Sequence, residues 1–164
     1  MDTPDVAAAA AVHRLVDRHE TLATAESLTG GLVASTVVEI PGVSSVYRGG
    51  LVVYATDLKH ALAGVSEALL EERGPVDSDV AVALARGARE RCSADWGLAT
   101  TGVAGPEPQD GKPVGLVYVA CSGPGGDTVR ELKLDGNRAA IRTESVTSAL
   151  QLLADCLCEA PAPS

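Results

Sequence analysis

Aromatic residues are nearly absent from this chain of 164 residues, which has no phenylalanine, one tryptophan and three tyrosines. Surfaces that bind single-stranded nucleic acid without sequence preference stack the bases on aromatic side chains, so the composition leaves little scope for such a surface. The core must instead be packed from alanine, valine, leucine and glycine. Small side chains of this kind favour close contacts between helices and a sheet.

Positive charge is also scarce, because 13 lysines and arginines stand against 22 aspartates and glutamates, for a net charge of -9. Broad binding to a nucleic-acid backbone needs a basic face, so we expect no nucleic-acid partner. The overall charge still allows a few arginines to hold one small phosphate.

Long apolar runs are missing as well. No run reaches the ~18 residues needed to span a bilayer, and the amino-terminal segment lacks the basic region of a secretory signal. We therefore expect a cytoplasmic protein without membrane association. The four cysteines form no CxxC pair and have no histidine at metal-ligand spacing, which favours free thiols in a reducing compartment over a metal or redox site; they are Cys92, Cys121, Cys156 and Cys158.

The order of apolar and polar segments predicts a single α/β domain over residues 1–164. We expect helices at about 4–19, 32–38, from 58, 66–74, 80–92 and 137–158, and strands at 21–25, 51–55 (buried), 96–101, 114–121 and 128–134. The expected helix caps are Ser66, Asn137, Thr56 or Asp57, and Asp77 or Ser78. Alternating strands and helices indicate parallel neighbours, whereas the short turn at 123–127 indicates a final antiparallel pair. The prediction is a three-layer α/β/α sandwich with a mixed, mainly parallel sheet of about five strands.

Ligands of open α/β sheets bind beyond the carboxyl ends of the parallel strands, and three segments reach that edge: 26–31, 54–59 and 101–106. In the first, Ser27 is followed by a glycine turn and a helix, where backbone N–H groups can stabilise a developing oxyanion. Ser27 is thus a candidate nucleophile. The alternative is that Ser27 or Thr29 only caps the helix, which is the commoner use of such residues.

A serine nucleophile needs a base, and none of the three histidines is an obvious partner; they are His13, His19 and His60. Lys59 begins a helix at the same sheet edge. With an ordinary pKa of ~10.4, only about 0.04% of a lysine is neutral at pH 7, so a lysine base must be desolvated until its pKa falls toward ~7–8. Spacing alone favours the alternative of a surface lysine.

Two further patterns are consistent with phosphate or ribose binding. The glycine-rich segments 101–106 and 111–115 offer a backbone cradle, or else are two turns that bracket a loop. Arg138 and Arg142 lie four residues apart and share a helix face, where they either clamp a phosphate or point into solvent.

Taken together, these motifs resemble the CinA carboxy-terminal domain family. The resemblance rests on AESLTGG (25–31), Tyr54 with Lys59, TGVAGP (101–106) and GKPVG (111–115), and it extends from about 13 to 158. It implies a serine amidohydrolase that converts nicotinamide mononucleotide to its nicotinic acid form with release of ammonia, without metal or cofactor. Such an enzyme would serve pyridine nucleotide salvage.

The resemblance also implies residue roles. Ser27 corresponds to the nucleophile, Lys59 to the base, Ser44 to a supporting hydroxyl and Tyr54 to a nearby site tyrosine. The expected oxyanion donors lie around Thr29, Gly30 and Gly31, and the nucleotide-side loop contains Thr101, Gly102, Gly105 and Pro106. Arg142 resembles a substrate-contacting arginine, with Arg138 as a less certain neighbour.

Two differences from the family pattern leave alternatives open. Residues 55–58 read Ala-Thr-Asp-Leu where the family often has Ser-Asn-Glu-Ala, and the 107–110 loop lacks paired glycines. The chain is therefore either the amidase, an amidase for another pyridine or amide, or a non-catalytic nucleotide-binding regulator linked to competence or DNA damage. An alanine- and valine-rich surface helix, together with the oligomers common in the family, leads us to expect a homo-oligomer.

Overall fold

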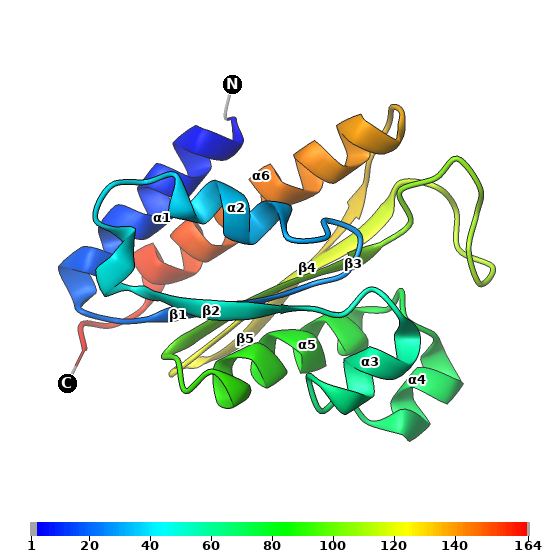
Figure 1. Ribbon diagram of the computed structural model, residues 1–164, viewed down its shortest axis with the longest axis horizontal. Coiled ribbons are helices and arrows are strands. Elements are labelled where there is room, and N and C mark those ends of the chain that lie inside the picture. The colour runs from blue at the N-terminus through cyan, green and yellow to red at the C-terminus, as the bar shows by residue number, and fades with distance from the viewer. Residues whose placement is uncertain (1–2, 164) are drawn as a thin grey trace.

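The computed structural model describes residues 3–163 and places a five-stranded sheet between two layers of helices (Figure 1). The strands are β1 (Leu22–Glu26), β2 (Tyr47–Val52), β3 (Trp96–Gly102), β4 (Leu116–Gly123) and β5 (Gly126–Lys133). The helices are α1 (Pro4–Arg18), α2 (Leu32–Val38), α3 (Thr56–Ala61), α4 (Glu67–Arg73), α5 (Ser78–Arg91) and α6 (Arg138–Glu159), with a 3-10 turn, η1, at Val43–Ser45.

The sheet has the order β2-β1-β3-β4-β5. β1 pairs in parallel with both β2 and β3, whereas β4 pairs antiparallel with β3 and β5. The predicted three-layer sandwich with a mixed sheet is confirmed. Among the described residues, two of the four strand pairings are parallel and two are antiparallel, and the antiparallel pairings lie at the β5 side, as the short turn near residue 124 indicated.

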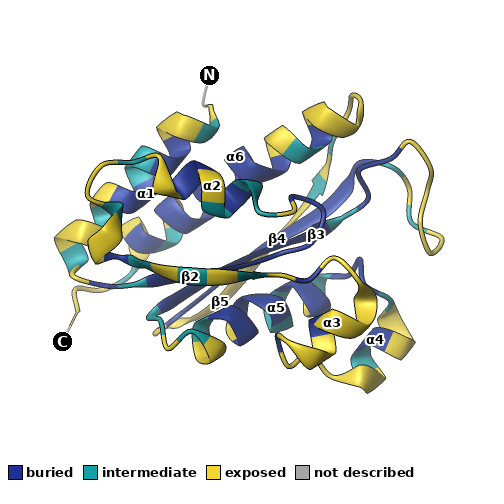
Figure 2. Cartoon of the chain, viewed as in Figure 1, coloured by how far each residue is buried: buried dark blue, intermediate teal, exposed yellow. Residues whose placement is uncertain are grey.

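The two faces of the sheet are covered by different helices. α1, α2 and α6 pack on one face, and α3, α4 and α5 lie on the other (Figure 1). The face of α1 that meets α6 is buried, as are the faces of α5 and α6 that meet the sheet (Figure 2). Small residues allow this close packing, because a Cβ added at Gly97 in β3 would lie 2.0 Å from the carbonyl oxygen of Ala85 in α5. No helix within residues 3–163 combines the length and apolar character required to cross a bilayer.

The cap predictions are partly confirmed. The side chains of Ser66, Asp77 and Asn137 accept backbone N–H groups at the starts of α4, α5 and α6. The prediction for α3 is wrong, since Ala55 occupies its cap position and provides no side-chain hydrogen bond.

The predicted buried strand at 51–55 is also wrong, because β2 ends at Val52. β2 is an edge strand that pairs only with β1, and its residues alternate between partly buried and exposed. Gly49 and Gly50 interrupt the apolar pattern that would have revealed its start. Gly50 is required by close contact, because a Cβ there would lie 2.2 Å from Thr24 Oγ1.

Candidate active site

Ser27 follows the last residue of β1, and its backbone N–H donates to the carbonyl of Thr100 in the neighbouring β3 (3.1 Å). The chain then turns through Gly30 and Gly31, which both have positive φ, 56° and 104°. Glycine adopts this left-handed conformation without the strain that a side chain would introduce. The turn leads directly into α2, for which Gly31 is the cap residue.

The buried carboxylate of Glu26 caps this turn and the start of α2. It accepts the Thr29 hydroxyl (2.6 Å) and the backbone N–H groups of Val33 (2.8 Å) and Ala34 (3.0 Å). The alternative in which Ser27 or Thr29 caps the helix is therefore wrong, and the Ser27 hydroxyl is left for another contact. Glu26 escaped sequence reasoning because it lies seven residues before Val33, outside the spacing of local capping motifs.

That other contact is Lys59. The α3 helix directs Lys59 into the interior, where the residue is 1% exposed and its Nζ lies 3.0 Å from Ser27 Oγ. Nζ also donates to the carbonyls of Val53 (2.9 Å) and Tyr54 (3.2 Å). Burial lowers the pKa of Lys59 from 10.5 to about 8. The alternative of a surface lysine is wrong.

The three oxygens around Nζ suit an exchange of a proton with Ser27. Carbonyl oxygens only accept hydrogen bonds, so Val53 and Tyr54 take two N–H groups of Lys59 in either protonation state. In the ammonium form the third N–H donates to Ser27 Oγ. In the neutral amine that position holds the lone pair, and the Ser27 hydroxyl can donate to it. The two carbonyls thereby aim the lone pair at the serine.

Ser27 and Lys59 open onto a cavity of about 330 Å³ at the carboxyl end of β1 and β3. Its wall includes the predicted residues Tyr54, Thr101, Gly102, Gly105, Pro106 and Arg138, together with Leu28, Pro75, Val76, Val103, Ala104, Glu107, Pro108 and Gln109. The three sheet-edge segments selected from the sequence therefore converge. The 75–76 turn was missed, because its place in the wall depends on a hydrogen bond from Thr101 Oγ1 to the Pro75 carbonyl (2.6 Å).

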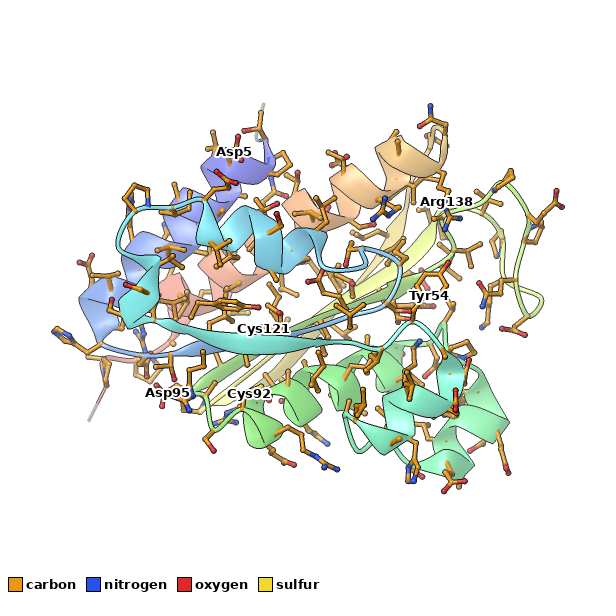
Figure 3. The ribbon with its side chains drawn as sticks, viewed as in Figure 1. Asp5, Tyr54, Cys92, Asp95, Cys121 and Arg138 are labelled. Atoms are coloured by element: carbon orange, nitrogen blue, oxygen red, sulfur yellow. The ribbon has the colours of Figure 1, made fainter. Side chains whose placement is uncertain are left out.

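Arg138 and Tyr54 form the rim of this cavity. The Arg138 guanidinium donates to Tyr54 Oη (3.1 Å) and to the Gly105 carbonyl, so it links the first turn of α6 to two of the converging segments. Figure 3 shows Tyr54 and Arg138 at the same end of the sheet, with Cys92 and Asp95 at the other. Two of the five guanidinium N–H groups are used, which leaves donors for a ligand.

Arg142 lies outside the cavity wall and has a different role. Its guanidinium donates to the carbonyls of Leu28 (2.9 Å) and Thr29 (3.1 Å), and so it holds the loop that carries Ser27. Arg138 therefore lines the cavity and Arg142 supports the loop, whereas the resemblance gave Arg142 as the substrate-contacting arginine and Arg138 as its less certain neighbour.

Several residues predicted to bind substrate are engaged elsewhere. The Thr29 hydroxyl is fully buried between Glu26 and Thr100, and neither Gly30 nor Gly31 lines the cavity. The Gly30 N–H already donates to the Ser27 carbonyl (3.0 Å). The expectation that N–H groups at 29–31 hold an oxyanion is not supported, because none of these three residues lines the cavity.

Ser44 is not near the site in this chain. It lies in η1, which precedes β2, and β2 begins opposite Leu22 at the amino end of β1. Ser27 follows the carboxyl end of the same strand. Since the two strands run parallel, the exposed Ser44 sits at the opposite edge of the sheet. Its assignment as a supporting hydroxyl is wrong, because the position came from resemblance and not from topology.

Known proteins are similar to this chain in both sequence and fold. Residues 5–157 match the model of the CinA C-terminal domain. The CinA-like protein of Frankia casuarinae is 50% identical over 147 residues, which cover 90% of this chain and 34% of that protein. The chain spans about a third of the length of the curated relatives it matches.

Solved structures of CinA proteins have the same fold as this chain. The competence/damage inducible protein CihA from Agrobacterium tumefaciens has a TM-score of 0.90 at 34% identity, covering 97% of this chain and 98% of that chain. A CinA superfamily protein from Escherichia coli has a TM-score of 0.89 at 34% identity, covering 93% and 90% of the two chains. The chain therefore belongs to the CinA C-terminal domain family.

Proposed function

We propose that this chain is a nicotinamide-nucleotide amidohydrolase that converts nicotinamide mononucleotide and water to nicotinic acid mononucleotide and ammonia. The observation that carries the proposal is the buried pair of Lys59 Nζ and Ser27 Oγ, 3.0 Å apart at the wall of a cavity. A desolvated lysine beside a serine hydroxyl is the arrangement that a serine nucleophile needs when no histidine is at hand.

In the first half of the reaction, neutral Lys59 takes the proton of the Ser27 hydroxyl while Oγ attacks the carboxamide carbon. The tetrahedral intermediate then loses its nitrogen, which receives the proton from Lys59 and leaves as ammonia. With a pKa of about 8, about 9% of Lys59 is neutral at pH 7 and about half at pH 8. The cationic pyridinium of the substrate withdraws electrons and makes the carboxamide more reactive.

In the second half, water attacks the acyl group on Ser27 and Lys59 takes a proton from it. Collapse of this intermediate releases the carboxylic acid and restores the serine. We assign the oxyanion to the backbone N–H of Leu28, because this residue directly follows the nucleophile and lines the cavity. This replaces the 29–31 donors, because Gly30 and Gly31 do not line the cavity and the Gly30 N–H already donates to the Ser27 carbonyl.

The rim of the cavity offers contacts for the phosphate and for the pyridinium ring of the nucleotide. A cavity of about 330 Å³ is at the small end of ligand sites, which are ~300–1,000 Å³. The free donors of Arg138 would bind the phosphate in the bidentate manner that a guanidinium favours. The exposed ring of Tyr54 lies beside it, where an aromatic face attracts a cationic ring.

The test is ammonia release from nicotinamide mononucleotide by the wild type, Ser27→Ala and Ser44→Ala. Ser44→Ala is the matched control, because it removes the same hydroxyl at the opposite edge of the sheet. We expect Ser27→Ala to lose turnover by at least about 1,000-fold with its fold intact, and Ser44→Ala to keep the wild-type rate. Wild-type turnover in Ser27→Ala would refute the assignment.

A non-catalytic nucleotide-binding protein is the competing function. The names of the relatives, CinA-like and competence-damage inducible, refer to no reaction. Calorimetric binding of the same nucleotide to the wild type, without ammonia release from pH 7 to 9, would favour that regulator over the enzyme.

A further inference from the structure

The segment between β3 and β4 contains a small hairpin next to residues that line the cavity. The Gln109 N–H donates to the Lys112 carbonyl (3.1 Å), and the Lys112 N–H donates to the Gln109 carbonyl (2.8 Å). Asp110 and Gly111 lie between them and both have positive φ, 49° and 74°. Positive φ at both central residues is the requirement of a type I′ turn, for which Asp-Gly is a favoured pair. The hairpin therefore holds this segment in place where it extends beyond the sheet (Figure 1).

Glu107 lies just before the hairpin, and its backbone is restrained on both sides. Arg138 donates to the carbonyl of Gly105, two residues earlier, and so anchors the start of the segment. Pro106 and Pro108 flank Glu107 directly. A proline fixes its own φ and restricts the residue before it to extended conformations. Little backbone freedom is left for Glu107 to lose when a ligand binds, which favours binding.

Glu107 is the one acidic residue of the cavity wall as the described residues form it. Within residues 3–163 its side chain makes no hydrogen bond and no ion pair, although Arg138 and Lys59 line the same wall. Charged side chains that line one cavity without pairing with each other stay available to a ligand. The Glu107 carboxylate is thus an acceptor that the protein itself does not use.

Four polar side chains of the wall already have roles in the proposed function. Ser27 and Lys59 face the carboxamide, and the rim formed by Tyr54 and Arg138 takes the ring and the phosphate. The part of the nucleotide that remains is the ribose, which carries two neighbouring hydroxyl groups. A carboxylate has two oxygens that can accept both O–H groups, and a charged acceptor makes the stronger hydrogen bonds. The amide of Gln109 offers one acceptor oxygen only.

We propose that Glu107 determines specificity for the sugar, because its carboxylate binds the 2′ and 3′ hydroxyl groups of a ribonucleotide. This inference rests on the proposed amidase function and narrows the substrate class to pyridinium ribonucleotides. The ribose hydroxyls are remote from the carbon that reacts. Their contact with Glu107 therefore acts in binding, so its loss raises KM and leaves kcat largely unchanged.

The experiment compares ammonia release from nicotinamide mononucleotide and from its 2′-deoxy form, by the wild type and Glu107→Ala. In kcat/KM, the wild type should favour the ribonucleotide by about 10- to 100-fold, the effect of one hydrogen bond to a charged group. In Glu107→Ala this preference should fall to about threefold or less, through a rise in KM that is larger for the ribonucleotide. A general change in the fold would affect both substrates alike and leave the preference intact.

Two further variants act as controls. Glu107→Asp keeps the carboxylate and should retain part of the preference. Glu90→Ala removes an exposed carboxylate from the last turn of α5, outside the cavity wall, and should behave as the wild type. A wild type without preference for the ribonucleotide, or a preference that is unchanged in Glu107→Ala, would overturn the inference.

Failure of the amidase proposal gives a different result. In that case the wild type releases no ammonia from either nucleotide, and the role of Glu107 is read from calorimetric affinities for the same two compounds. A ribonucleotide preference that Glu107→Ala abolishes would still support sugar recognition by this residue. Equal affinities in the wild type, or no binding of either nucleotide, would overturn it.

Discussion

Replacing Lys59 by methionine should change how stability depends on pH, because burial in the wild type disfavours the charged form of this amine. The folded pKa of Lys59 is about 8, against 10.5 for the ordinary value, a difference of about 2.5 units (10.5 − 8) caused by burial. At ~1.4 kcal/mol per unit, protonation of Lys59 costs the folded state about 3 kcal/mol. Methionine has similar length and no charge, so it removes this cost.

The direction in which stability changes with pH follows from how many protons the folded and unfolded states bind. Below pH 8 both the folded and the unfolded wild type hold the Lys59 proton, and the full cost is present. Between about pH 8 and pH 10.5 the unfolded chain holds the proton while the folded protein has released it, so the wild type gains stability as pH rises. Above this window the cost has gone. Relative to Lys59→Met, the wild type should therefore gain about 3 kcal/mol from pH 7 to pH 10.5.

The assay is urea unfolding of the wild type and Lys59→Met over this pH range. Tyr47 and Tyr118, whose pKa values burial raises, titrate in both proteins and cancel in the difference. Lys133→Met is the matched control, because it removes an exposed lysine and should follow the wild type. A difference between wild type and Lys59→Met that stays constant with pH would refute the reasoning.

Three further predictions concern the site and its support. Ammonia release should rise about fivefold from pH 7 to pH 8 as Lys59 loses its proton, and a flat kcat profile over this range would contradict its role as the base. Glu26→Gln should destabilise the protein by about 1–3 kcal/mol in urea unfolding, because the amide would turn a donor toward a buried backbone N–H; unchanged stability would count against its capping role. Gly50→Ala should cost about 1–3 kcal/mol, since its Cβ would lie 2.2 Å from Thr24 Oγ1, whereas Gly125→Ala meets nothing within 4 Å and serves as the control; equal stability of the two variants would contradict the close contact.

Local signals in the sequence predicted most of the fold. The turn residues near 124 predicted the final antiparallel pair, and Ser66, Asp77 and Asn137 predicted the starts of three helices. These predictions succeeded because each residue acts within a few positions of itself in the sequence. β2 was misplaced because Gly49 and Gly50 remove the apolar pattern from the strand, while Val53 continues it beyond the strand end.

The site was predictable to the extent that topology determines it. Ser27 and Lys59 both follow strands that end at one sheet edge, so the topology predicts their proximity without any knowledge of side-chain contacts. The contacts that depend on packing could not be predicted: Glu26 with α2, and Arg142 with the Ser27 loop. Ser44 shows the converse, because a position carried over by resemblance lies at the wrong edge.

The most direct test of the buried base is NMR titration of the lysine side chains. The chain has three lysines, so variants of the two others assign the Lys59 signal; these are Lys112 and Lys133. A midpoint near 8 is predicted for Lys59. A midpoint near 10.5, the ordinary value, would contradict it, because the amine beside Ser27 would then carry its proton throughout the physiological range.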